Sequence, residues 1–285
     1  MWHLDPPNTT ARDSYVTCVS GTQDAERRKL LLDAADAVTD AGERFRVAAA
    51  VQTLHELAEN EFTVPDIPNK DAVKWAYSNG MRSQAGRAIY DQLMDGPEDE
   101  RCPMCGYGEV YQLDHVMPKI KFPALCVDPL NLVPACAVCN HTKGQVSPSS
   151  IETTPLHPYL DQIDRETWLD AAVISGGQGG LTYFITPPPT WDDTLTARVK
   201  YHFRLFKLGK RYGGQANRAL KNIRSILQQQ LQSAGETAVR DYLIRESGTR
   251  LANDPNGWDG VAYRVWAGHD EFCRGGFGTD LSVEF

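Results

Sequence analysis

Four of the seven cysteines in this 285-residue chain form two C-x2-C pairs. The pairs are Cys102 with Cys105 and Cys136 with Cys139, and 30 residues separate them. Two such pairs supply four thiolates that can close a tetrahedron around zinc. Since four sulfurs leave no open position for water, we expect a structural zinc ion. The alternative interpretation is four unrelated buried thiols.

Polar residues suited to phosphodiester hydrolysis lie between and beside these pairs. The segments are YQLDHVMPK (Tyr111–Lys119) and DPLNLVPACAVCNHTKG (Asp128–Gly144). Hydrolysis needs a general base for water and a cation for the charge that builds on phosphorus. A neutral imidazole such as His115 can take the proton. Asp114 and Asn140 offer oxygen ligands for Mg²⁺ or a similar ion. In isolation, Asp114 could simply form a cap or ion pair, and His115 could be a surface histidine.

Residues 101–145 resemble the HNH endonucleases, the ββα-metal nuclease family, in the form braced by a four-cysteine zinc site. D-H-x-x-P-K, N-L and C-x-x-C-N-x-x-K occur in that family's order and spacing. The resemblance implies that Asn131 fixes the loop that positions the base, and that Lys119 and Lys143 contact phosphate. It also implies a catalytic Mg²⁺ or Mn²⁺ ion and hydrolysis to a 5′-phosphate and a 3′-hydroxyl. The chain departs from the commonest motif in placing His141 directly after Asn140, so His141 is a further candidate for contact with metal or phosphate.

A basic tract follows this segment in an otherwise acidic chain. The formal net charge is −8, which argues against a protein that coats nucleic acid by bulk electrostatics. Residues 194–235 nevertheless contain nine basic side chains and no acidic one. This tract is either a solvated helix face or a nucleic-acid surface. The candidate nucleic-acid contacts in it are Lys200, Arg204, Lys207 and Arg211.

The elements that must position these residues are mainly helical. Helix-like apolar spacing predicts helices over residues 24–60 and 71–94, joined by a proline-containing loop. After the cysteine segment, AAVIS and LTYFITP flank GGQGG and predict a β-hairpin. Residues 247–285 show no clear period. The further predicted helices cover residues 165–172, 192–207, 215–232 and 236–244.

These patterns predict an α+β fold, a mainly helical chain with a central zinc-braced ββα nuclease module and a small β-hairpin. The expected regions are an N-terminal helical region (1–98), the nuclease module (99–146) and a C-terminal hairpin and helical region with the basic tract (147–285). With 41% hydrophobic and 23% charged residues, the composition is that of a globular protein. No apolar run approaches the roughly 20 residues that span a bilayer, and the first residues lack the order of a secretion signal, so we expect a cytoplasmic protein.

Three functions remain open from the sequence. The first is a metal-dependent endonuclease that acts on DNA in bacterial or phage defence or in a mobile element. The second is a non-catalytic, zinc-dependent nucleic-acid-binding or adaptor module, which the intact Asp-His, Asn and C-N-x-x-K positions disfavour. The third keeps catalysis but makes the chain a subunit that docks an ATPase partner or self-associates through its helical flanks.

Overall fold

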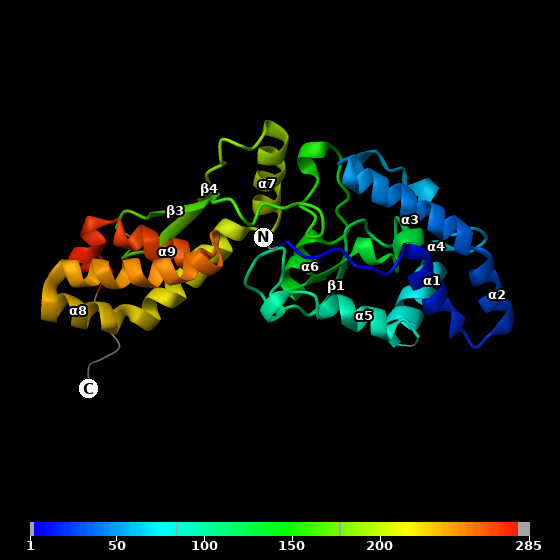
Figure 1. Ribbon diagram of the computed structural model, residues 1–285, viewed down its shortest axis with the longest axis horizontal. Coiled ribbons are helices and arrows are strands. Elements are labelled where there is room, and N and C mark those ends of the chain that lie inside the picture. Colours follow the sequence, from blue (N-terminus) through cyan, green and yellow to red (C-terminus); the bar gives the residue numbers. More distant parts are fainter. Residues whose placement is uncertain (1–2, 84, 177, 279–285) are drawn as a thin grey trace. The chain divides into compact units, whose positions relative to one another are not determined.

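Helices form most of the chain in the computed structural model, which describes residues 3–83, 85–176 and 178–278 (Figure 1). The helices are α1 (Ala11–Ser20), α2 (Ala25–Asp33), α3 (Ala35–Ala50), α4 (Asn69–Ala72), α5 (Arg87–Met94), α6 (Ala137–Lys143), α7 (Asp193–Leu205), α8 (Leu208–Asn253) and α9 (Trp258–Ala267). The strands are β1 (Gln112–His115), β2 (Leu132–Ala135), β3 (Leu169–Val173) and β4 (Leu181–Ile185), which pair as two separate antiparallel sheets. The predicted mainly helical α+β class is therefore confirmed. No helix in the described ranges is long and apolar enough to cross a membrane.

The chain divides into two compact units. The first unit comprises Met1–Gln162 with Ala197–His202, and the second comprises Ile163–Thr196 with Phe203–Phe285. The predicted regions 1–98 and 99–146 both lie in the first unit.

The N-terminal helices of the first unit begin at side-chain caps. Thr10 accepts a hydrogen bond from the backbone N–H of Asp13 at the start of α1, and Asp24 accepts one from Arg27 at the start of α2. The predicted helix over 24–60 is wrong in its extent, because the chain breaks at Ala34 between α2 and α3 and leaves the α-helix after Ala50. Helix α1 was not predicted.

These helices share one hydrophobic core with the segment that carries the candidate site. Phe45 of α3 and Phe62 belong to the same buried cluster as Leu113 of β1 and Phe122. The rings of Phe62 and Phe122 meet edge to face with centroids 5.4 Å apart. The N-terminal helices therefore pack directly against the segment that carries the candidate site and help to fix where its side chains lie.

The segment over residues 101–145 contains two antiparallel strands followed by a helix. In the β1–β2 pair, Asp114 lies opposite Val133 and His115 opposite Leu132. Helix α6 starts immediately after β2, with Cys136 as its N-cap. The ββα arrangement implied by the resemblance is thus present in the chain.

The second unit contains the predicted hairpin, β3 with β4, and the long helix α8 packed against α9. Helix α8 is kinked at Gly235, whose φ of 77° is a conformation that glycine adopts most easily. The kink falls between the two helices predicted over 215–232 and 236–244. The helix predicted over 165–172 is wrong, because Leu169–Val173 form strand β3. Helix α9 was not predicted, because its segment shows no clear period.

Candidate active site and metal centre

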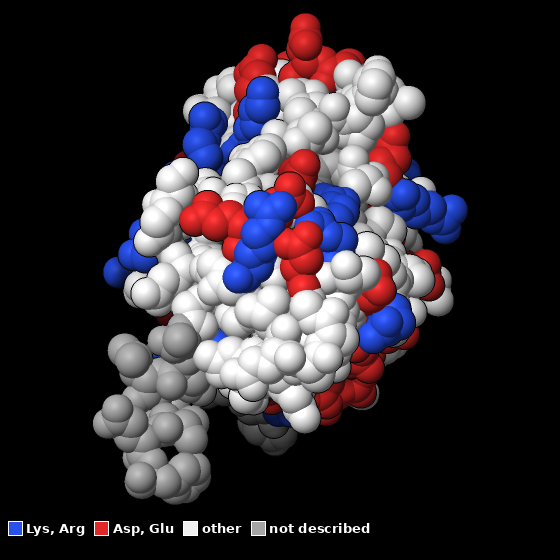
Figure 2. Space-filling view, turned by 90° about the vertical axis from the view of Figure 1, so that its left-hand side faces the viewer, with Lys and Arg blue, Asp and Glu red and all other residues white. Residues whose placement is uncertain are grey.

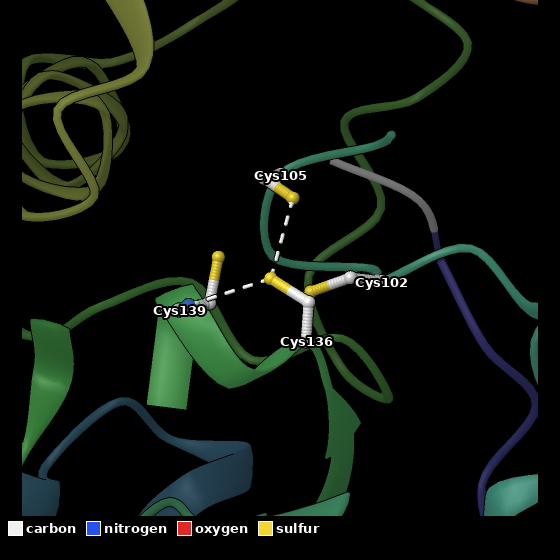
Figure 3. A group of neighbouring side chains, drawn as sticks. All are labelled: Cys102, Cys105, Cys136 and Cys139. Atoms are coloured by element: carbon white, nitrogen blue, oxygen red, sulfur yellow. Dashed lines mark hydrogen bonds between the residues drawn. The ribbon is translucent and has the colours of Figure 1, made fainter. Parts of the chain in front are cut away.

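Four buried cysteines lie together in the first unit. The sulfur atoms of Cys102, Cys105, Cys136 and Cys139 all lie within 4.8 Å of one another. Figure 3 shows them converging from the loop that carries the first pair and from the start of α6. The predicted pairing of the two C-x2-C motifs into one cluster is therefore confirmed.

Backbone groups around the cluster are arranged to hold sulfur ligands. The Cys136 Sγ accepts a hydrogen bond from the backbone N–H of Cys139 at 3.4 Å, and the Cys105 Sγ accepts one from Gly108 at 3.4 Å. Hydrogen bonds from the neighbouring cysteine side chains hold the pKa of Cys136 well below its usual range. Four cysteine sulfurs this close together fit a single metal ion, because soft metal ions prefer thiolate ligands.

Asp114 and His115 end strand β1 at a polar cavity of about 150 Å³. Asn140 of α6 and Lys119 line the same cavity. The sequence placed these four residues in one site, and the structure brings them together. Asn131 and Lys143 do not line this cavity, and both are buried.

The ring of His115 is held in a defined tautomer. Its Nε2 lies 2.9 Å from the carbonyl oxygen of Cys126, and a carbonyl accepts only from a protonated nitrogen, so Nδ1 carries the lone pair. The ring of Tyr77 packs edge to face against it, with centroids 4.6 Å apart. His115 is only 5% exposed, and this burial lowers its pKa to about 3. The imidazole is therefore neutral at pH 7.

The carboxylate of Asp114 has one oxygen engaged and one unpaired. Its Oδ1 accepts a hydrogen bond from the backbone N–H of His115 at 2.7 Å. Its Oδ2 is buried and has no hydrogen-bond partner among the residues that the structure describes. Burial raises the pKa of Asp114, and the nearby charge of Lys143 opposes that rise. This carboxylate oxygen receives no hydrogen bond, and the amide of Asn140 lines the same cavity. Together the two side chains offer oxygen ligands that fit a hard cation.

Asn131 lies fully buried and fixes the loop that follows β1. Its Oδ1 accepts from the backbone N–H of Met117 at 2.7 Å, and its Nδ2 donates to the carbonyls of Met117 and Leu125 at 3.1 Å each. Asp128 caps the short turn that carries Asn131 by accepting from Leu130. Asn131 therefore holds the backbone of this loop in position and does not itself line the cavity.

The two predicted phosphate-contacting lysines lie in different surroundings. Lys119 lines the cavity, and its ammonium group lies 4.4 Å from the centroid of the Tyr77 ring. Lys143 is 3% exposed, and its ammonium group donates to the backbone carbonyl of His115 at 2.5 Å. Its burial beneath the Asp-His pair is at odds with the predicted contact to phosphate. His141 is exposed and does not line the cavity.

Tyr77, Arg82 and Tyr90 of the N-terminal helical region also line the cavity. No pattern in the sequence marked these three residues as part of the site. Aromatic residues at helical spacing predict a core face, and a single arginine after such a run carries no motif. Only the tertiary fold brings them to the Asp-His pair.

The basic tract is divided between environments. Lys200, Arg204 and Lys207 are exposed and Arg211 is half-buried, whereas Arg198 is buried in a two-pronged ion pair with Asp161. Lys200 belongs to the first unit, and the other three candidate contacts belong to the second. On the face drawn in Figure 2, basic and acidic side chains are interspersed, and the second unit contains ion pairs such as Arg240–Asp270 and Arg274–Glu236.

Comparison with known proteins places the chain in a phage protein family. No protein-family model and no solved structure matches the chain. Protein ea31 of Escherichia phage lambda is 30% identical to it over 215 residues, which cover 70% of this chain and 72% of ea31. Identity of this extent over most of both chains shows common descent, and the chain therefore belongs to the family of protein ea31.

Proposed function

We propose that this protein is a metal-dependent HNH endonuclease that hydrolyses phosphodiester bonds in DNA. One observation carries the proposal. The ββα segment brings Asp114, His115 and Asn140 to one polar cavity, and Asn140 directly follows Cys139 of the buried four-cysteine cluster in α6. A polar cavity that combines a neutral imidazole with an unpaired carboxylate oxygen suits water activation better than nucleic-acid binding alone.

The four-cysteine cluster is proposed to hold zinc. Four thiolates satisfy the tetrahedral preference of Zn²⁺ and exclude a water ligand. The ion would brace the loop that carries Cys102 and Cys105 against the N-terminus of α6. It is therefore assigned a structural and not a catalytic role.

A second, catalytic ion is proposed at the cavity. The residues that would hold Mg²⁺ or Mn²⁺ are Asp114, through its unpaired Oδ2, and Asn140, through its amide oxygen. When bound, the ion supplies charge neutralisation to the phosphate oxygens. Two protein ligands suit Mg²⁺, which usually keeps several waters or phosphate oxygens in its shell.

His115 is proposed as the general base. Its Nδ1 lone pair would take a proton from the attacking water, since Nε2 is committed to the carbonyl oxygen of Cys126. Its lowered pKa keeps the ring neutral, so that the lone pair on Nδ1 is free across the physiological pH range. Lys119 would contact the phosphate from the cavity wall, while Asn131 and Lys143 would position the backbone around the base.

Membership in the family of a phage lambda protein supports a role in phage biology, in a mobile element or in bacterial defence, inside the cytoplasm. DNA is the proposed substrate. One HNH site cuts one strand, so cleavage of a duplex would need a second copy or a second event. Alternatively, the chain would act as the nuclease subunit of a complex with an ATPase partner.

Incubation of purified protein with supercoiled plasmid and Mg²⁺ or Mn²⁺ tests the proposal. The wild type should nick or linearise the plasmid, and His115→Gln should reduce the rate by about 10²- to 10⁴-fold. Glutamine retains a donor for the Cys126 carbonyl but cannot act as the base. His269→Gln, in the second unit, is the matched control and should cleave normally. Wild-type protein that binds DNA without cutting it under any divalent ion would favour the adaptor function instead.

A further inference from the structure

The wall of the catalytic cavity is completed by a segment outside the ββα module. Tyr77, Arg82 and Tyr90 come from the N-terminal helical region and line the cavity together with Asp114 and His115. In the sequence they precede Cys102, the first residue of the four-cysteine cluster, by at least 12 residues. Residues of both the ββα module and the N-terminal helical region therefore form the cavity.

The segment that presents Arg82 has an unusual and tightly held backbone. Helix α4 continues as a π-helical segment, Val73–Met81, and Arg82 is its C-cap. A β-carbon added to Gly80 would lie 2.4 Å from the carbonyl oxygen of Cys18, so only glycine permits this close approach to α1. Wide helical turns of this kind are frequent at functional sites, because they re-aim side chains. Here the turn ends at the cavity.

Tyr77 contacts both His115 and Lys119. One edge-to-face contact joins the Tyr77 ring to His115, and the ammonium group of Lys119 lies 4.4 Å from the centroid of the same ring. The ring is buried, and its contact with Lys119 is a cation–π interaction. Tyr77 thus fixes Lys119 at the cavity wall without neutralising its charge.

Arg82 and Lys119 are two neighbouring cations that line the cavity. Neither forms an ion pair with an acidic side chain among residues 3–83, 85–176 and 178–278. Burial lowers the pKa of Lys119 and the positive charge of Arg82 lowers it further, while Cys126 and Asp114 oppose this shift. Two cations that repel each other in a chain of net charge −8 indicate a site for an anion from outside the chain.

We propose that Arg82 and Lys119 form a phosphate-binding pair for the nucleic-acid backbone at the catalytic cavity. The guanidinium of Arg82 would grip two phosphate oxygens, and the Lys119 ammonium would add a point charge held in place by Tyr77. The pair rests on the proposed nuclease function for the identity of its ligand. Through Arg82, the N-terminal helical region would contact the substrate, in addition to the ββα segment.

DNA binding measured without divalent ions tests the pair separately from catalysis. A fluorescent duplex is titrated with wild type, Arg82→Gln, Lys119→Gln and Arg82→Lys, each first checked for a wild-type melting temperature. Each Gln variant should bind about three- to tenfold more weakly at 0.1 M salt and flatten the plot of log affinity against log salt by about 0.9. Arg82→Lys should restore the salt slope but only part of the affinity. Lys74→Gln, an exposed lysine on the same π-helical segment, is the charge-matched control and should bind as the wild type does.

The outcomes separate this proposal from the proposed function. Variants at Arg82 and Lys119 that bind with the affinity and salt slope of the wild type overturn the phosphate pair, even if the wild type cleaves plasmid. Weakened binding by both variants together with a wild type that never cleaves upholds the pair and overturns the nuclease. Wild-type protein that binds no DNA overturns the pair as well.

Discussion

The ammonium group of Lys143 lies 2.5 Å from the carbonyl oxygen of His115 and 3.5 Å from Oδ1 of Asp114. One side chain at the end of α6 therefore holds both members of the Asp-His pair, which end β1. Burial lowers the pKa of Lys143, while the Asp114 carboxylate opposes that shift. The buried ammonium group of Lys143 thus joins helix α6 to the end of strand β1.

Lys143→Met should destabilise the first unit by about 3 to 5 kcal/mol, because it removes one partner of a buried ion pair and leaves the Asp114 charge uncompensated. The measurement is urea unfolding followed by circular dichroism. Asp114→Asn combined with Lys143→Met should cost clearly less than the sum of the single changes. Lys121→Met, at an exposed pair with Glu59, is the control and should cost less than about 1 kcal/mol. Additive costs in the double variant would contradict the prediction.

Substitutions at Asn131 test whether its hydrogen bonds hold the loop after β1 in place. Asn131→Ala removes the partners of the N–H and carbonyl of Met117 and one of the two donors to the carbonyl of Leu125, and should cost about 2 to 4 kcal/mol together with most of the cleavage. Asn131→Asp keeps the acceptor for Met117 but faces the two carbonyls with an oxygen, so it should not restore stability. Thermal unfolding and plasmid nicking measure both effects. An Asp variant as stable as wild type would show that the Nδ2 contacts do not hold the loop.

The motif residues were predictable because their spacing encodes local geometry. Two C-x2-C pairs had to converge if one ion was to join them, and Asp114, His115 and Asn140 follow the order of a ββα fold. The roles of Lys143 and Arg198 were not predictable, since both are basic residues whose burial depends on partners 29 and 37 positions away. Arg82 reached the site through packing of another region, which no local pattern records.

Strand β3 shows the same limit in the second unit. Its second half belongs to the hairpin that AAVIS and LTYFITP predicted, whereas Leu169 and Asp170 lie in the segment predicted as a helix over 165–172. The side-chain Oδ1 of Asn256 accepts hydrogen bonds from the backbone N–H groups of Trp168 and Leu169, at 2.8 and 3.1 Å. A residue 88 positions away from Trp168 thus helps to set the start of the strand. Tertiary contacts decided this element over local propensity.

The four-cysteine cluster predicts about one zinc ion per chain. Cys139→Ser should lose that zinc and unfold the first unit at a lower temperature, because metal binding free energy becomes folding free energy. Cys273→Ser, at a buried cysteine of the second unit, is the control and should keep its zinc. Elemental analysis by mass spectrometry gives the stoichiometry, and thermal unfolding with and without a chelator gives the stability. Zinc-free wild type with an unchanged melting temperature would refute the assignment.

His202 predicts a defined pH dependence of stability. Its Nε2 donates to the carbonyl oxygen of Met104 within the first cysteine turn, and burial lowers its pKa to about 3. An unfolded histidine has a pKa near ~6.5, so between pH 6.5 and 3 the unfolded chain binds the extra proton. The stability that His202 contributes is therefore complete above pH 6.5 and is lost as the pH falls.

His202→Gln removes this titration while keeping a hydrogen-bond donor. The stability gap between wild type and the variant should narrow by up to about 1.4 kcal/mol for each pH unit below 6.5. Urea unfolding at pH 7.5, 6, 5 and 4.5 measures the gap. His157→Gln should show the same trend, because burial lowers the pKa of His157 to about 4. A gap that stays constant or widens in acid would be inconsistent with a neutral, buried His202.

The basic tract is tested by salt dependence. Arg204 and Lys207 are exposed residues of the second unit, and each phosphate contact on duplex DNA adds about 0.9 to the slope of log affinity against log salt. Arg204→Gln with Lys207→Gln should weaken binding and flatten that slope, while cleavage recovers at saturating DNA because the catalytic cavity is intact. Lys29→Gln with Arg46→Gln removes the same charge from two exposed ion pairs of the first unit and serves as the control. If both double variants change the slope equally, the effect is one of net charge. If the Arg204 and Lys207 variant matches the wild type, those two side chains are only solvated and the phosphate contacts lie elsewhere.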